Sequence, residues 1–190
     1  MMFKVVNYAN KEQIKNHRLA ENIKILKEVI RGDFSNSPKF TGFGGLLKDM
    51  LDTIVQKELK TFLSDEQIQS LIRSTSTAYF TPTEIISFCW QIVEKLGFNG
   101  GKVLEPTCGT GLFFEYMPKH IRKNSKLTGI ELESLSYHIA QATHQDVKFL
   151  NQAYQDYNEQ GQDLIIGNPP YNSQKLKKVP TNNILEKIND

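Results

Sequence analysis

Four residues near the end of the chain combine an amide, two prolines and an aromatic hydroxyl. They are Asn168, Pro169, Pro170 and Tyr171, and they follow the apolar run 164–166 almost directly. Proline has a fixed φ angle and no N–H, so this turn presents carbonyl oxygens and the Asn168 side-chain amide. Two such acceptors can hold both hydrogens of a planar –NH2 group while the tyrosine ring stacks on the attached group. The pattern therefore predicts a site that holds an amine.

The segment before this turn is typical of a buried strand, with Asp163 ahead of it and Gly167 after it. Ligands of parallel α/β sheets bind outside the carboxyl ends of the strands, which is where the turn would lie. A rigid loop with an asparagine turn is the alternative, and Asn-Pro alone would favour it. The full tetrapeptide after such a strand, with an aspartate in front, favours a functional role.

A glycine loop and an acidic residue form a second pattern, and their separation in the sequence is typical of nucleotide-binding folds. The apolar segment 102–105 leads into the loop 106–111 (Pro-Thr-Cys-Gly-Thr-Gly), after which a helix is expected. Glycines let a ligand approach the backbone closely, and a helix start offers free N–H groups. Glu131 follows about 20 residues later at the tip of a predicted strand, where a carboxylate can accept ribose hydroxyls. A solvated glutamate beside Glu133 is the alternative interpretation.

Strands and helices alternate in the second half of the chain, which predicts an α/β fold with a mostly parallel sheet. We expect strands over 102–105, 126–131, 147–150 and 163–166, and helices over 82–97 and 133–142. Apolar positions cover much of the circumference of helix 82–97, so we expect it to be well buried. Cys89 on this helix is better explained as a small core residue than as a nucleophile.

The first 75 residues predict a helical segment. Periodic apolar positions indicate helices over 10–31 and 45–60, and Ser64 is a candidate cap for a third. The glycine-rich segment 40–46 (Phe-Thr-Gly-Phe-Gly-Gly-Leu) is no dinucleotide-binding fingerprint, because no strand precedes it. We therefore divide the chain into a helical segment 1–75, an α/β core 76–171 and a polar tail 172–190 that we expect to form a loop.

Composition argues against several classes of protein. The chain has 190 residues, 39% of them hydrophobic, and a net charge of +2, so no strong field by itself indicates nucleic acid. No apolar run approaches the roughly 20 residues that cross a membrane, and no secretion signal is present. Two cysteines make no disulfide framework, and the histidines lack metal-ligand spacing. We expect a cytosolic protein with no metal and no membrane contact.

With these motifs in this order, the sequence resembles S-adenosylmethionine-dependent methyltransferases that act on amino groups. It is most similar to adenine-N6 DNA methyltransferases whose cofactor motif precedes the catalytic one, over roughly residues 76–171. The resemblance implies a Rossmann-like methyltransferase fold, S-adenosylmethionine as cofactor, and DNA with a flipped-out adenine as partner. It also implies that this is the front portion of such an enzyme, since about three further strands and a target-recognition domain would be needed.

The resemblance also implies roles for individual residues. Those that would be catalytic are Asn168, Pro169, Pro170 and Tyr171. Those that would bind the cofactor are Tyr79, Thr81, Glu105, Pro106, Thr107, Cys108, Gly109, Gly111, Glu131, Leu132 and Gln152.

Two further features bear on the resemblance. The family's adenine-binding position after the third strand is usually acidic, whereas Asn151 or Gln152 stands there in this chain, with Asp156 a more distant candidate. Segment 40–46 is similar to one that precedes the methylase domain in large phage and conjugative-element methylases.

Other functions stay open on the sequence alone. The same tetrapeptide occurs in enzymes resembling the protein-glutamine methyltransferases and some ribosomal RNA methyltransferases, because glutamine also carries a planar –NH2 group. A non-catalytic module of a larger restriction, antirestriction or conjugation protein is the second alternative. A dinucleotide dehydrogenase fits poorly, because hydride transfer has no use for Asn-Pro-Pro-Tyr.

Overall fold

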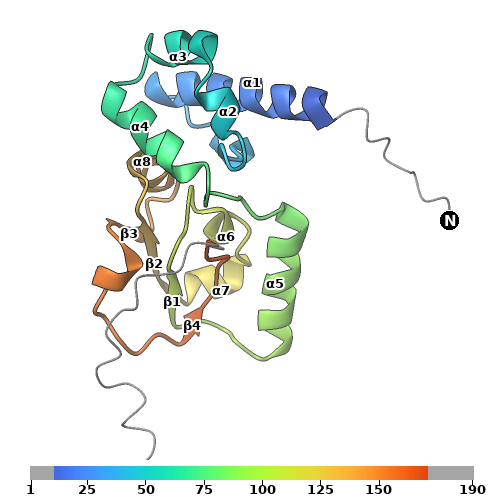
Figure 1. Ribbon diagram of the computed structural model, residues 1–190. Coiled ribbons are helices and arrows are strands. Elements are labelled where there is room, and N and C mark those ends of the chain that lie inside the picture. Colours follow the sequence, from blue (N-terminus) through green and yellow to red (C-terminus); the bar gives the residue numbers. More distant parts are fainter. Residues whose placement is uncertain (1–10, 171–190) are drawn as a thin grey trace, which may run out of the picture.

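The computed structural model of the chain describes residues 11–170 (Figure 1). Within this range, no helix is both long enough and apolar enough to cross a membrane. The elements, in chain order, are α1 (Lys11–Ile30), η2 (Ser37–Lys39), α2 (Leu47–Met50), α3 (Thr53–Leu59), α4 (Asp65–Ser74), α5 (Thr83–Lys95), β1 (Lys102–Glu105), α6 (Leu112–Glu115), α7 (Lys119–Lys123), β2 (Lys126–Glu131), α8 (Ser134–Thr143), β3 (Val147–Asn151), η3 (Tyr154–Asp156) and β4 (Leu164–Ile165).

The four strands form one parallel sheet in the order β3-β2-β1-β4. Strand β1 is central, since Val103 pairs with Leu127 of β2 on one side and with Leu164 of β4 on the other. This arrangement confirms the predicted α/β, Rossmann-like fold. The strand order reverses between β1 and β4, and ligands of such sheets bind at that switch point.

Asp163 fastens the amino end of β4 to β1. Its Oδ2 accepts the Lys102 N–H at 2.7 Å, and its own N–H donates to the Lys102 carbonyl at 2.9 Å. Further along, the Ile166 N–H donates to the Leu104 carbonyl at 3.0 Å. Asp163 therefore stabilises the pairing of β4 with β1, at the end of β4 opposite to Asn168.

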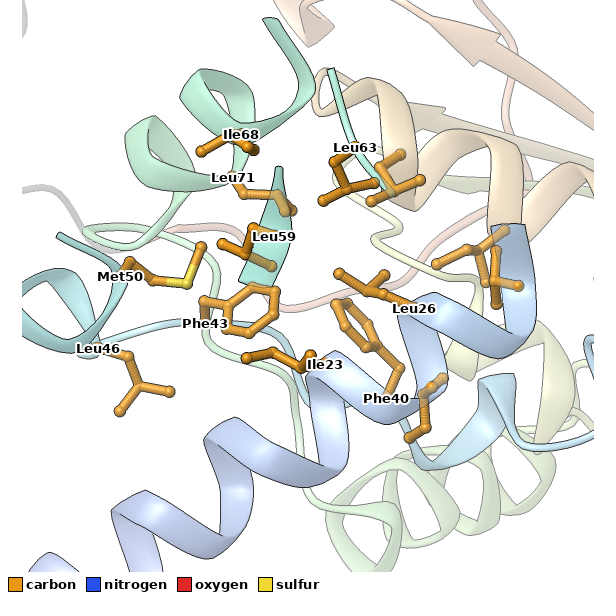
Figure 2. Close-up of a cluster of buried hydrophobic side chains, with 14 residues drawn as sticks. Ile23, Leu26, Phe40, Phe43, Leu46, Met50, Leu59, Leu63, Ile68 and Leu71 are labelled. Atoms are coloured by element: carbon orange, nitrogen blue, oxygen red, sulfur yellow. The ribbon is translucent and has the colours of Figure 1, made fainter. Parts of the chain in front are cut away.

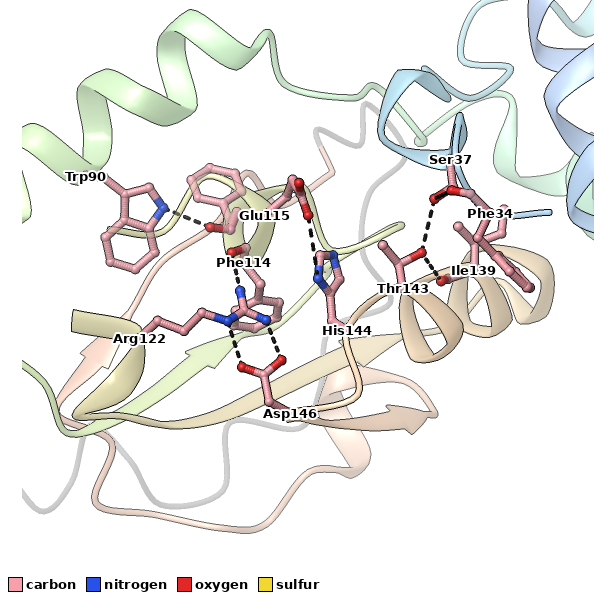
Figure 3. A network of polar contacts seen from close by, with 11 residues as sticks. Phe34, Ser37, Trp90, Phe114, Glu115, Arg122, Ile139, Thr143, His144 and Asp146 are labelled. Carbon is pink, nitrogen blue, oxygen red and sulfur yellow. Dashed lines mark hydrogen bonds and ion pairs between the residues drawn. The ribbon is translucent and has the colours of Figure 1, made fainter. Parts of the chain in front are cut away.

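The N-terminal helices have a hydrophobic core that includes part of α8 (Figure 2). Its largest fully buried side chains include Phe40, Phe43, Leu46 and Met50. Helix α8 contributes Leu135 and Ile139, and α4 packs on α8. A polar contact also joins the N-terminal segment to α8, because the hydroxyl oxygens of Ser37 and Thr143 lie 3.0 Å apart (Figure 3). The division at residue 75 stays a prediction, and residues 172–190 lie outside the described part.

The prediction of one helix over 45–60 is wrong, because two short helices, α2 and α3, occupy this range. Helix α2 ends at Met50, and Asp52 caps α3, with its side chain accepting the N–H groups of Ile54 and Val55 at 2.8 and 3.3 Å. The break exposes Leu51 and Ile54 to solvent. By contrast, the predicted cap at Ser64 is confirmed as a capping box with Gln67 at the start of α4.

Helix α5 is less buried than its apolar sequence indicated. Ile86 and Trp90 face the core, whereas a stripe on another face of the helix is exposed: Ile85, Phe88, Ile92 and Leu96. On the buried face, Trp90 Nε1 donates to the Phe113 carbonyl at 2.8 Å and joins α5 to α6 (Figure 3).

We expect Trp90→Phe to lower the free energy of unfolding by about 1–3 kcal/mol, because it leaves the buried Phe113 carbonyl without its donor. Urea unfolding followed by circular dichroism measures this effect. Replacing exposed Gln91 on the same helix with alanine is the control and should change stability by less than about 0.5 kcal/mol. Equal stability of Trp90→Phe and the wild type would contradict the assigned role.

A polar network joins α7 to the segment before β3 (Figure 3). Arg122 binds both carboxylate oxygens of Asp146 and donates to the Phe114 carbonyl. The Arg122 side chain lowers the pKa of Asp146 through these hydrogen bonds. Next to them, His144 Nδ1 lies 3.7 Å from a carboxylate oxygen of Glu115. The His144 ring also packs on the glycine loop, because a Cβ added to Gly111 would lie 2.7 Å from His144 Cδ2.

Candidate functional site

The carboxyl ends of all four strands lie at one edge of the sheet, because the strands are parallel. Glu105, Glu131 and Asn151 are the last residues of β1, β2 and β3. Segment 166–168 follows β4 at the same edge. The structure therefore brings together three of the segments predicted to be functional: the glycine loop, the acidic strand tip and the Asn-Pro turn.

The end of β4 lies directly against the end of β1. A Cβ added to Gly167 would lie 3.3 Å from Glu105 Cγ and 3.5 Å from Pro106 Cδ, which is close packing of the two segments. Asn168 is the next residue and is half-buried, whereas Pro169 and Pro170 are exposed. Tyr171 lies outside the described residues. The Asn-Pro turn and the glycine loop therefore share one region of the edge.

The glycine loop contains buried polar atoms that have no partner among the described residues. Residues 11–170 contain four such side-chain atoms: one is Arg18 Nε, and three lie at or next to the loop, on Glu105 (Oε2), Thr107 (Oγ1) and Thr110 (Oγ1). Buried polar groups are normally hydrogen-bonded, because an unmade bond costs about 1–3 kcal/mol. This donor and acceptor set suits a polar ligand with cationic and hydroxyl groups.

Glu105 is the most deeply buried carboxyl of the site, with 2% of its surface exposed. Burial, together with the nearby charge of Glu131, raises the pKa of Glu105 well above its ordinary value. Burial also raises the pKa of the Cys108 thiol, and the charges of Glu105 and Glu131 add to this effect. A thiol held neutral is a poor nucleophile, so Cys108 contributes shape and its backbone rather than covalent chemistry.

The raised pKa of Glu105 predicts a pH effect on stability. The folded protein holds a proton that the unfolded chain releases near the ordinary value of 4.5, so this contribution is fully present below that pH. It is lost as the pH rises through the folded-state pKa. Unfolding free energies measured against pH should therefore fall in the wild type relative to Glu105→Gln over this window. Parallel curves for the two proteins would contradict the assignment.

Glu131 is held in place by backbone donors from two segments. Its Oε2 accepts the Gly109 N–H at 2.8 Å, and its Oε1 accepts the Glu133 N–H at 2.7 Å. Burial raises the pKa of Glu131, and these N–H groups offset part of the increase. Each carboxylate oxygen keeps a further lone pair, so the group can still accept two hydroxyls. The adjacent Glu133 has another role, because it caps α8 and accepts the Ser70 hydroxyl at 2.8 Å.

The two candidates for the adenine-contact position are in different situations. Asn151 Nδ2 donates to the carbonyls of Glu131 and Leu132, at 2.8 and 3.2 Å, and so ties β3 to the end of β2. Gln152 is half-buried and adjoins this pair, and the side chain of Leu132 is exposed. Asn151 is thus engaged in the fold, which leaves Gln152 better suited to contact a ligand.

The segment before α5 reaches the glycine loop through Phe80, a residue without a predicted role. Phe80 ring atoms Cε1 and Cζ would lie 3.3 Å from a Cβ at Gly109. Tyr79 instead lies beside Gly44 and Gly45 of the N-terminal segment and is 54% exposed, and Thr81 is half-buried. The signal for Phe80 was its place inside the Tyr-Phe-Thr-Pro motif, where only its neighbours received a role.

Comparison with known proteins identifies the class of this chain. The model of the family described as N-6 DNA Methylase matches residues 66–188, which is more than half of the sequence. The chain belongs to the N-6 DNA Methylase family, and the resemblance inferred from the motifs is confirmed. The residues described contain no group of three His, Cys, Asp or Glu side chains that could hold a metal ion.

Individual relatives come from viruses of different hosts. Type II methyltransferase M.CvrRI of Paramecium bursaria Chlorella virus XZ-6E is 36% identical over 100 residues, covering 52% of this chain and 25% of the relative. Defense against restriction protein B of Escherichia phage P1 is 29% identical over 135 residues, covering 65% of this chain and 6% of the relative. This chain thus spans a quarter or less of the length of either protein.

One solved structure that the chain matches is a modification subunit assigned to a type I restriction enzyme from Vibrio vulnificus YJ016. The TM-score is 0.40 at 22% identity, and the match covers 65% of this chain and 33% of that subunit.

Proposed function

We propose that this chain carries the donor-binding and amine-positioning part of an enzyme that methylates the N6 amine of adenine in DNA. The observation that carries the proposal is the packing of Gly167 against Glu105 and Pro106, which sets Asn168 beside the glycine loop. Membership of the N-6 DNA Methylase family supports both the reaction and the substrate.

The residues present fit S-adenosylmethionine as the methyl donor. Glu131 has lone pairs for two ribose hydroxyls, and the orphaned atoms of Glu105, Thr107 and Thr110 offer partners to an amino acid moiety or to bound water. When bound, this cofactor supplies a methyl group on a positively charged sulfur. An amine can attack that methyl group and displace the sulfur without a protein nucleophile or a metal. The neutral thiol of Cys108 agrees with that chemistry.

The protein's own contribution is to position the target amine. The Asn168 carboxamide oxygen and the Pro169 carbonyl would accept the two amine hydrogens and direct the nitrogen lone pair at the methyl group. This is catalysis by orientation and by stabilisation of the charge that develops on nitrogen. Tyr171 would stack on the base, which must leave the duplex to reach the edge of the sheet.

A methyl-transfer assay with parallel substrates tests the proposal. The chain is incubated with S-adenosylmethionine labelled on the methyl group and with duplex DNA, structured RNA or a protein that exposes a glutamine. We expect label only in DNA, recovered as N6-methyladenine after digestion to nucleosides. Label in RNA or glutamine would contradict the DNA substrate, and no label in any of them would contradict methyl transfer by this chain.

A further inference from the structure

Helix α1 holds the glycine-rich segment 40–46 by the backbone. The Asn22 side chain is 1% exposed; it donates to the Gly42 carbonyl at 2.6 Å and accepts the Thr41 N–H at 3.0 Å. Arg18, one turn earlier, donates to the Gly44 carbonyl. On the other side of the segment, the Gly45 N–H donates to the Thr75 carbonyl at 2.8 Å. The segment is therefore fixed between α1 and the link that leads from α4 to α5.

Phe80, on that link, lies between this segment and the glycine loop. A Cβ at Gly42 would lie 2.5 Å from Phe80 Cε2, and a Cβ at Gly109 would lie 3.3 Å from Cε1 and Cζ of the same ring. Phe40 packs against the same ring edge-on, with centroids 5.6 Å apart and planes at 90°. Figure 1 shows the link between α4 and α5 running between the N-terminal helices and the strands.

The contacts continue from Phe80 to the proposed ribose carboxylate, because the Gly109 N–H donates to Glu131 Oε2 at 2.8 Å. We propose that Phe80 is a positioning residue for the donor-binding turn and that Asn22 and Gly42 hold it there. The inference rests on the proposed function and goes beyond it, because it makes the N-terminal helices part of the cofactor site. Gly42 has a φ of +66° and is packed on the ring, so any side chain there must displace Phe80.

Gly42→Ala tests the inference, and Gly32→Ala is its matched control. Both glycines have positive φ angles, +66° and +86°, in the same helical segment, so both replacements carry the left-handed backbone penalty. A Cβ at Gly32 meets nothing within 4 Å, whereas one at Gly42 meets the Phe80 ring. Any difference between the two variants therefore reports on the contact with Phe80 rather than on backbone strain.

The first measurement needs no cofactor. Hydrogen exchange of the Gly109 amide, followed by NMR, should be faster by about tenfold in Gly42→Ala and unchanged in Gly32→Ala, because only the former disturbs the turn that donates to Glu131. Thermal unfolding, read from the single tryptophan, verifies that both variants are folded. Equal exchange rates in the two folded variants would overturn the inference.

The second measurement is calorimetric titration with S-adenosylhomocysteine. We expect about tenfold weaker binding for Gly42→Ala and wild-type affinity for Gly32→Ala. Phe80→Leu, a milder change that keeps an apolar side chain, should weaken binding by itself. It should also remove most of the additional effect of Gly42→Ala, since the ring that the new methyl group meets is gone.

The outcomes separate the inference from the proposed function. If the wild type binds the cofactor and both Gly42→Ala and Phe80→Leu bind it equally well, the positioning role alone is overturned. The same holds if the effects of the two substitutions on affinity are strictly additive. No binding by the wild type would overturn the proposed function and, with it, the role in cofactor binding. If Gly42→Ala does not fold, Phe80→Leu decides: weaker binding supports the inference and unchanged affinity overturns it.

Discussion

We expect Asn168→Ala to lower the rate of methyl transfer by about 10²–10³-fold while leaving affinity for S-adenosylmethionine within about twofold of the wild type. The reason is the position of Asn168, which follows the close contact of Gly167 with Glu105 and is separate from the backbone donors that hold Glu131. The alanine removes the carboxamide that would orient the amine. It removes no atom of the glycine loop.

Single-turnover methyl transfer and cofactor titration, made on the same preparation, measure the two quantities separately. Asn158→Ala is the matched control, because Asn158 is an exposed asparagine in the loop before β4. It should change neither quantity. Loss of cofactor affinity in Asn168→Ala comparable to its loss of rate would contradict the separation of roles.

We expect Glu131→Ala to have the opposite profile, with affinity for the cofactor reduced about ten- to hundredfold. This range corresponds to about 1.5–3 kcal/mol for hydrogen bonds to a charged group. The substitution removes the proposed acceptor for ribose hydroxyls and also frees the Gly109 N–H. Calorimetric titration measures the effect.

The neighbouring Glu133 provides a sharp comparison. It caps α8 and accepts the Ser70 hydroxyl, so Glu133→Ala should lower stability by about 0.5–2 kcal/mol with little effect on cofactor affinity. Loss of affinity in Glu133→Ala equal to that in Glu131→Ala would mean that the two carboxylates do not have distinct roles.

Local patterns in the sequence predicted the sheet well, because each strand is short, apolar and bounded by turn residues. Strand β1 has the predicted bounds, β3 is longer than predicted by one residue, and β4 is shorter by one residue at each end. The parallel order followed from the alternation of strands and helices. The same reasoning failed at 45–60, where the cap formed by Asp52 was not recognised within an apolar pattern.

Long-range packing was not predictable in the same way. The apolar sequence of α5 gives no sign of which of its faces has a partner, and the stripe containing Phe88 is exposed in the described part of the chain. The sequence places Asp163 next to the Asn-Pro turn as part of its functional context, yet its side chain bonds to β1 at the opposite end of β4. Phe80 was missed because its contacts with Gly42 and Gly109 join residues far apart in the sequence.

The central claim is that the methyl donor and Asn168 occupy one region at the carboxyl edge of the sheet. An NMR titration of the labelled chain with S-adenosylmethionine tests it most directly, with the Gly109 backbone amide and the Asn168 side-chain amide as probes and the Gly32 amide as reference. We predict that Gly109 and Asn168 shift along one saturation curve while Gly32 stays unchanged. Saturation at Gly109 with no change at Asn168 would contradict the claim.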